Sequence, residues 1–112
     1  MLYIDDDNNI KLTRGDSASF DLSVKQGTET YDYSNDLVQF TVKRNTITED
    51  VVIQKTFTSG SISLAPSDTK DLHYGDLVYD VQIITSSNDV YTVIGPCKFE
   101  LTDEVNFNVQ YS

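Results

Sequence analysis

The sequence contains a single cysteine, Cys97, and no tryptophan among its 112 residues. One thiol cannot form an internal disulfide, and no second cysteine is present to complete a zinc-type ligand set. No apolar run approaches the ~20 residues that a helix needs to cross a bilayer. The chain therefore has to fold by burying side chains, and we expect no metal, no cofactor and no membrane partner.

Basic residues are also scarce, since 8 Lys and Arg stand against 18 Asp and Glu and give a formal charge of −10. Proteins that bind a phosphate backbone gather Lys and Arg on one face, whereas here these residues are scattered along the chain. Nucleic acid is therefore not expected as a partner. With 38% hydrophobic residues, the chain has enough apolar side chain for one modest core.

The first residues lack the features of a signal peptide. Met1-Leu2-Tyr3-Ile4 runs directly into three aspartates, with neither a basic segment nor a long apolar segment. We expect a complete gene product that is made in a cytoplasm.

Apolar side chains alternate with period two in short blocks, and no window keeps helical spacing for more than one turn. Within 51–57, the alternation predicts that Val51, Ile53 and Phe57 face the core. Gly95-Pro96 separates the last two alternating blocks, 90–94 and 98–101. Proline has no N–H to donate, so it interrupts the hydrogen bonds between paired strands at this point. The only helical candidate is one turn at 66–71. The predicted strands are 10–12, 19–24, 37–42, 51–57, 61–64, 77–84, 90–94 and 98–101.

Short strands with turns at regular intervals over about 100 residues are typical of a seven-stranded antiparallel sandwich of immunoglobulin type. We predict this all-β fold for residues 1–104. Segment 105–112 follows as an extra β-capable stretch, either an added edge strand or an arm that pairs with a neighbouring subunit. Its alternating apolar side chains are Val105, Phe107, Val109 and Tyr111.

The stretch 5–9 is rich in the carboxylate and amide oxygens that calcium prefers. A calcium loop of the EF-hand type needs Gly at its sixth position and Glu at its twelfth, whereas counting from Asp5 gives Ile10 and Asp16. A solvated turn between two short strands is therefore the preferred interpretation, with calcium as the alternative.

No stretch carries a catalytic motif. Arg14-Gly15-Asp16 spells a tripeptide that adhesion receptors read, but a plain turn before the next strand is the simpler interpretation. His73 has no nucleophile or metal-binding pattern around it, and Cys97 has only Lys98 as a basic neighbour. We therefore predict no catalytic and no metal-binding residue, and do not expect an enzyme.

Tyrosine occurs seven times. Tyr31 and Tyr33 precede the strand 37–42, where they suit either a contact surface or a loop that folds back over a sheet. Together with Asp32 they also form the kind of cluster, aromatic rings beside a carboxylate, that binds sugars. We name both tyrosines as candidate assembly contacts, together with the apolar side chains of segment 105–112.

Three stretches, 10–20, 67–81 and 95–99, carry a family resemblance. In them a Gly15-Asp16-Ser17 turn opens a strand, and a strand with Tyr79-Asp80-Val81 follows the helical turn. The chain resembles small immunoglobulin-like structural proteins of tailed phages and prophages of Gram-positive bacteria, and is similar to the N-terminal domain of phage baseplate upper proteins.

This resemblance implies a virion structural protein of the tail or baseplate, without catalytic residues. It implies other virion proteins as partners, a homo-oligomer in the assembled particle, and the virion as location. The alternatives are a module that binds a host-surface carbohydrate or protein, and a head decoration or neck protein.

Overall fold

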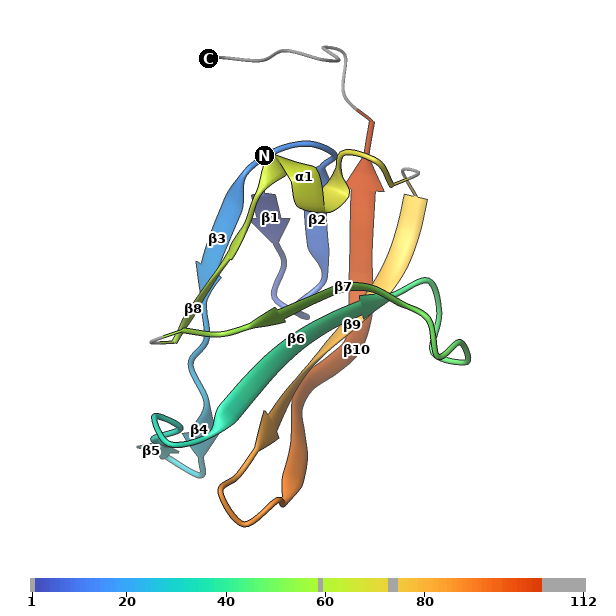
Figure 1. Ribbon diagram of the computed structural model, residues 1–112. Coiled ribbons are helices and arrows are strands. Elements are labelled where there is room, and N and C mark those ends of the chain that lie inside the picture. The colour runs from blue at the N-terminus through green and yellow to red at the C-terminus, as the bar shows by residue number, and fades with distance from the viewer. Residues whose placement is uncertain (1, 59, 73–74, 104–112) are drawn as a thin grey trace.

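The computed structural model describes residues 2–58, 60–72 and 75–103 (Figure 1). The predicted segment 105–112 and His73 lie outside these residues. The described residues form ten strands and one short helix. In chain order these elements are β1 (Leu2–Ile4), β2 (Ile10–Thr13), β3 (Ala18–Asp21), β4 (Lys25–Gln26), β5 (Glu29–Thr30), β6 (Leu37–Lys43), β7 (Val51–Thr56), β8 (Ser61–Leu64), α1 (Pro66–Thr69), β9 (Gly75–Ile84) and β10 (Val90–Thr102).

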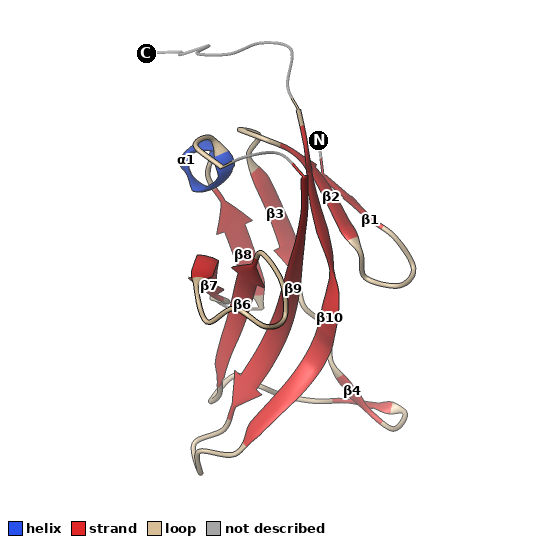
Figure 2. Cartoon of the chain, turned by 90° about the vertical axis from the view of Figure 1, so that its right-hand side faces the viewer, coloured by secondary structure: helices blue, strands red, loops and turns tan. Residues whose placement is uncertain are grey.

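The prediction of an all-β fold is confirmed. One sheet has six strands in the order β1-β2-β10-β9-β6-β7, a second sheet pairs β3 with β8, and β4 and β5 form a separate small hairpin. Figure 2 shows the β3-β8 pair beside the large sheet, so the arrangement is sandwich-like. The helical turn α1 joins β8 back to the large sheet at β9, as the sequence predicted.

One pairing differs from the predicted antiparallel arrangement, because β2 runs parallel to β10 with Ile10 opposite Phe99 and Leu12 opposite Leu101. After β2 the chain leaves the large sheet for β3 instead of turning back in a hairpin. The last described strand, β10, then fills the place beside β2, and it runs in the same direction.

The core lies between the two sheets and is centred on Phe40 of β6, which is fully buried. Its ring lies 5.4 Å from that of Phe20 on β3, 5.2 Å from that of Tyr79 on β9 and 6.1 Å from that of Phe99 on β10, measured between centroids. Edge-to-face and tilted pairs of this kind add stability beyond the area that they bury. The inward positions predicted from alternation on β6, β8 and β9 are buried.

Alternation failed at the start of β7. Val51 was predicted to face the core, but it is 48% exposed. The pairing register with β6 shifts between Val42 and Lys43, so that Val42 lies opposite Ile53 while Lys43 lies opposite Val51. This irregularity inserts an extra residue, Val52, which packs against the core in place of Val51.

The prediction of two strands at 90–94 and 98–101 is wrong, since both belong to the single strand β10. The predicted irregularity is present as register shifts against β9 on either side of Ile94. Gly95 has φ of +99°, and an added Cβ would lie 2.7 Å from the carbonyl oxygen of Tyr79. The absence of a side chain at Gly95 thus allows β9 and β10 to stay paired through the kink.

The turn 5–9 joins β1 to β2 and closes on itself. The Asp5 carboxylate accepts hydrogen bonds from the backbone N–H groups of Asp7 and Asn9, both at 2.9 Å. The turn is also attached to the large sheet, because Tyr79 donates its hydroxyl proton to the carbonyl of Asn8 and Lys98 donates its backbone N–H to Asn9 Oδ1 at 3.0 Å. The predicted turn between two short strands is confirmed.

We expect Tyr79→Phe to destabilise the protein by about 1 kcal/mol, because the substitution removes one hydrogen bond and leaves the packed ring in place. Urea denaturation followed by circular dichroism measures this difference. Tyr3→Phe is the matched control, since the Tyr3 side chain is 64% exposed. Equal stability of the two variants would show that the bond to the turn contributes nothing.

Candidate binding site at the 30–36 loop

The Arg14-Gly15-Asp16 tripeptide, which adhesion receptors could read, makes hydrogen bonds and an ion pair within the domain. The Arg14 guanidinium donates to the carbonyl oxygen of Leu72 at 2.9 Å and forms an ion pair with Asp103 at 3.4 Å. The Gly15 N–H donates to Thr69 Oγ1 at 2.8 Å. This tripeptide is therefore attached to the body of the domain, as a turn.

The thiol of Cys97 is half-buried and lies 3.5 Å from the carbonyl oxygen of Asp7. Burial, followed by the negative charges of Asp5 and Asp7, raises the pKa of the thiol. A thiol whose pKa is raised is a poor nucleophile at neutral pH. Among the described residues, no group of three or more His, Cys, Asp or Glu is placed to hold a metal ion, and the Asp5 carboxylate is engaged in its own turn.

A loop at residues 30–36, which we call the tyrosine loop, connects the β4-β5 hairpin to β6. It lies at the end of the molecule where the β4-β5 hairpin and the turn between β9 and β10 also lie (Figure 1). Both Tyr31 and Tyr33 pack against the hydrophobic core and are half-buried. The structure thus favours the interpretation of a loop that folds back, while the predicted assembly contact at these residues stays a prediction.

Tyr31 is held by the loop itself. Its hydroxyl donates to Asp36 Oδ2 at 2.6 Å, and its backbone N–H donates to the carbonyl oxygen of Val24 at 2.8 Å. The hydrogen bond to Asp36 raises the pKa of the Tyr31 hydroxyl, and burial raises it further. The phenol therefore stays protonated at neutral pH and continues to donate its hydrogen bond to the Asp36 carboxylate.

Tyr33 reaches across to the second sheet. Its hydroxyl donates to the carbonyl of Leu22, and this contact depends on the lack of a side chain at Gly60, where a Cβ would lie 2.9 Å from the Tyr33 hydroxyl oxygen. The Asp36 N–H in turn donates to the carbonyl oxygen of Tyr33 at 3.0 Å. These bonds hold the tyrosine loop in one conformation.

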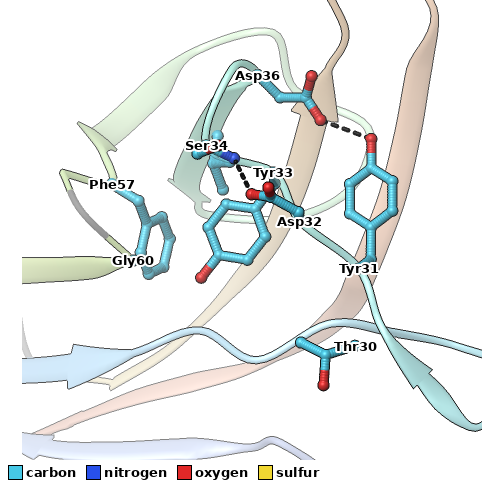
Figure 3. Close-up of a pocket in the computed structure, with 9 residues that line it drawn as sticks. Thr30, Tyr31, Asp32, Tyr33, Ser34, Asp36, Phe57 and Gly60 are labelled. Atoms are coloured by element: carbon cyan, nitrogen blue, oxygen red, sulfur yellow. Dashed lines mark hydrogen bonds between the residues drawn. The ribbon is translucent and has the colours of Figure 1, made fainter.

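The tyrosine loop encloses a hollow of about 560 Å³, which we call the tyrosine pocket (Figure 3). Three aromatic rings and two carboxylates contribute to its wall, and no Lys, Arg or His does. Its volume falls within the range of small-molecule sites. The lining residues are Thr30, Tyr31, Asp32, Tyr33, Ser34, Asp36, Val38, Phe57 and Gly60.

The sequence patterns did not predict that Asp36, Phe57 and Gly60 line this site. Phe57 follows β7 and Gly60 precedes β8, so they join the pocket only because the chain crosses between the two sheets beside the tyrosine loop. The Tyr31-Asp32-Tyr33 cluster was the one signal in the sequence that pointed here.

A smaller hollow of about 290 Å³ lies on the other side of Tyr31. Its wall is more apolar, with Ile83 and Val93 from β9 and β10, and the 56% exposed Tyr91 stands at its edge. Tyr31 thus lines two hollows, of which the smaller is the more apolar.

Exposed apolar side chains also occur on the strands of the large sheet. Within the part of the chain that is described, β1 and β7 each have one outer edge without a partner strand. Tyr3 and Ile4 of β1 are 64% and 40% exposed, and Val51 of β7 is 48% exposed. A sheet edge with apolar side chains is a place where a further strand can add.

The only helix of the described chain is α1, a single turn, so no described helix has the length and apolar character needed to cross a membrane. Comparisons with protein-family models, with curated proteins and with solved structures find no match to this chain. We therefore infer its function from its own residues.

Proposed function

We propose that the protein is a non-enzymatic structural module of a phage virion, associated with the tail or baseplate, which assembles with copies of itself and with other virion proteins. The observation that carries this proposal is the outer edge of β7 in the large sheet, which has no partner strand among the described residues. The sequence resemblance to phage baseplate upper proteins supports the setting, and the acidic surface, with a net charge of −10, keeps unassembled copies apart.

We further propose that the sandwich is of immunoglobulin type. In support, the chain crosses between two sheets, as it does in that fold: β3 and β8 pair in one sheet, while β10, β9, β6 and β7 are neighbours in the other. The chain lacks the tryptophan and the inter-sheet disulfide of antibody domains. The rings around Phe40 fill the space between the sheets instead.

The edge of β7 suits strand addition better than the edge of β1. β7 has six residues, whereas β1 has three. Shortness is one device that protects an edge, and lysine is another. The lysine of β7, Lys55, does not project freely into solvent, since its ammonium lies 3.1 Å from Asp68 Oδ1.

We assign the C-terminal segment of a second copy as the occupant of this edge. The alternating residues 105–111 number seven, close to the length of β7. Nine residues follow Asp103 and span about 30 Å when extended, which is more than the length of the six-residue strand β7. Because only Glu104 precedes the alternating stretch, the two copies have to lie in direct contact. Pairing in which one chain donates a strand to its neighbour produces a repeating assembly.

Removal of residues 105–112 is expected to leave a folded monomer that no longer associates. The described core does not include these residues, so their removal should change the free energy of unfolding by no more than a typical surface substitution does. Size-exclusion chromatography with light scattering measures the association, and urea denaturation checks the fold.

A matched variant keeps the segment and alters the acceptor edge. Val52→Pro removes an N–H near the start of β7 and should also abolish association. Because the Val52 side chain packs against the core, urea denaturation has to show that this variant is folded, and Ile47→Ser, in the exposed loop before β7, serves as the control. Association that survives the truncation would contradict the assigned arm.

The setting is tested separately by immunogold electron microscopy on particles induced from the source strain. Gold at one fixed place on the particle is the expected result, and it would also locate the protein in the head, neck, tail or baseplate. Particles without label, with the protein left in the lysate, would overturn the virion assignment.

A second candidate function is recognition of a host-surface carbohydrate. The observation that favours it is the tyrosine pocket, which combines aromatic rings with two carboxylates in one hollow. The two functions are compatible, because the pocket and the edge of β7 are different surfaces of the same domain.

A further inference from the structure

We propose that the tyrosine pocket binds a neutral pyranose, with Asp36 as hydrogen-bond acceptor for the sugar hydroxyls and the rings of Tyr31, Tyr33 and Phe57 as its apolar contact. This inference rests on the second candidate function and names its ligand class. It does not depend on the virion assignment.

The pocket is formed before any ligand binds. The bonds from Tyr31 to Asp36 and from Tyr33 to Leu22 tie the two aromatic walls to the loop and to the second sheet. The Asp32 carboxylate accepts the N–H of Ser34 at 3.0 Å and is fixed as well (Figure 3). A site whose groups are already in place loses little conformational entropy on binding.

The wall of the tyrosine pocket offers a hydrogen-bond acceptor and therefore suits a ligand that donates hydrogen bonds. Asp36 uses one carboxylate oxygen for Tyr31, and its other oxygen, Oδ1, accepts no hydrogen bond from the residues that the structure describes. The carboxylate is an acceptor only while it is ionised. Sugar hydroxyls are suitable donors, and hydrogen bonds to a charged acceptor are stronger than those between neutral groups.

The charge of the wall selects against anions. Asp32 and Asp36 both line the pocket, without a basic residue in the lining, and the whole chain carries −10. A phosphorylated or carboxylated sugar would meet repulsion in a partly enclosed hollow, where screening is weaker than in bulk water. The charge of the wall therefore excludes an anion, and the choice of a neutral sugar over a cation depends on the apolar part of the wall.

The remaining wall suits the C–H face of a sugar ring. Val38 and Phe57 belong to the core and are only 2% and 8% exposed, so the half-buried rings of Tyr31 and Tyr33 present most of the accessible apolar surface. A pyranose presents C–H groups on its faces and hydroxyls around its rim. It therefore matches a hollow in which apolar and acceptor groups stand side by side.

The test is titration of the full chain with methyl glucoside, methyl galactoside and N-acetylglucosamine, each at millimolar concentration, followed by amide shifts in two-dimensional NMR. We expect saturable shifts confined to the tyrosine loop, Phe57 and Gly60 with at least one of these sugars. Glucose 6-phosphate is expected to bind at least several-fold more weakly than the neutral glucoside, because of the two carboxylates.

Asp36→Asn keeps an acceptor for the Tyr31 hydroxyl but removes the charge, and it should weaken sugar binding by about tenfold or more. The double variant Asp32→Asn with Asp36→Asn should also narrow the difference between the glucoside and its phosphate. Asp50→Asn, which makes the same change in an exposed residue before β7, is the control and should leave both affinities unchanged.

Two results would overturn the inference, and they differ in what they mean for a binding module. Saturable shifts in the tyrosine loop with tetramethylammonium or lysine, but with no neutral sugar, would replace the pyranose by a cation and leave a binding function in place. No saturable shift with any of these probes would remove the carbohydrate-recognition candidate altogether. Neither result bears on the association through segment 105–112.

Discussion

Phe40→Ala is expected to lower the free energy of unfolding by about 4 kcal/mol, within the range for removing a large buried aromatic side chain. Phe40 is fully buried and lies within ring contact of Phe20, Tyr79 and Phe99. Its removal would leave a cavity between the two sheets that none of these rings can fill alone. Because a small domain is stable by only about 5–15 kcal/mol, the loss should be visible directly as a lower urea midpoint.

Leu37→Ala is the matched control for this experiment. Leu37 lies three residues earlier on the same strand, but its side chain is 43% exposed. Truncation there should change stability by no more than about 1 kcal/mol. A Phe40→Ala variant as stable as Leu37→Ala would show that the two sheets do not pack against each other through β6.

Gly95→Ala is expected to destabilise the protein by about 3 kcal/mol, because two independent costs fall on one methyl group. Gly95 has φ of +99°, which side chains other than glycine rarely adopt. The new Cβ would also lie 2.7 Å from the Tyr79 carbonyl oxygen, 2.9 Å from Asp80 Cβ and 3.0 Å from Asp80 Cα. These atoms belong to or adjoin the backbone of β9, so relief requires the two longest strands to separate.

Gly27→Ala distinguishes the two costs. Gly27 also has positive φ, +67°, but an added Cβ there meets no atom within 4 Å. Alanine at this position should therefore cost only the conformational strain, about 1 kcal/mol. Thermal and urea denaturation of both variants give the comparison. Equal losses at Gly27 and Gly95 would mean that the close approach of β9 and β10 is not tight.

These effects concern the scaffold on which the proposed functions depend. The β9-β10 pair provides Ile83, Tyr91 and Val93 to the hollow beside Tyr31, and Phe40 adjoins Val38, whose side chain lines the tyrosine pocket. A loss of packing at Phe40 should therefore weaken ligand binding in the tyrosine pocket together with stability, whereas the β9-β10 pair contributes no residue to the lining of that pocket. The Asp36→Asn variant should weaken binding alone, which separates a site effect from a scaffold effect.

Local pattern was sufficient to predict those strands whose residues alternate over several positions. In β6, β8 and β9 each inward residue is buried, and the helical turn begins at Pro66. A strand with one face in the core needs period two whatever its neighbours are, so this signal is present in the sequence alone. The same reasoning located the β1-β2 turn at 5–9, where side-chain oxygens satisfy local N–H groups.

Local pattern was insufficient where pairing or length decided the outcome. The strands β1, β4 and β5 have only two or three residues each and are too short to show alternation. At Val51, the register shift against β6 moved the side chain out of the core. Such a shift depends on the partner strand, so it cannot be predicted from Val51 itself.

The sequence by itself determined that this chain is acidic, has no internal disulfide and is built mainly of β-strands, because composition and period-two alternation are local properties. Only the tertiary structure decided that β2 runs parallel to β10, that β7 is left at an edge, and that Asp36, Phe57 and Gly60 join Tyr31 and Tyr33 around one pocket. These features arise from contacts between residues far apart along the chain. Such contacts depend on how the strands cross between the two sheets, and alternation within a strand carries no information about that crossing.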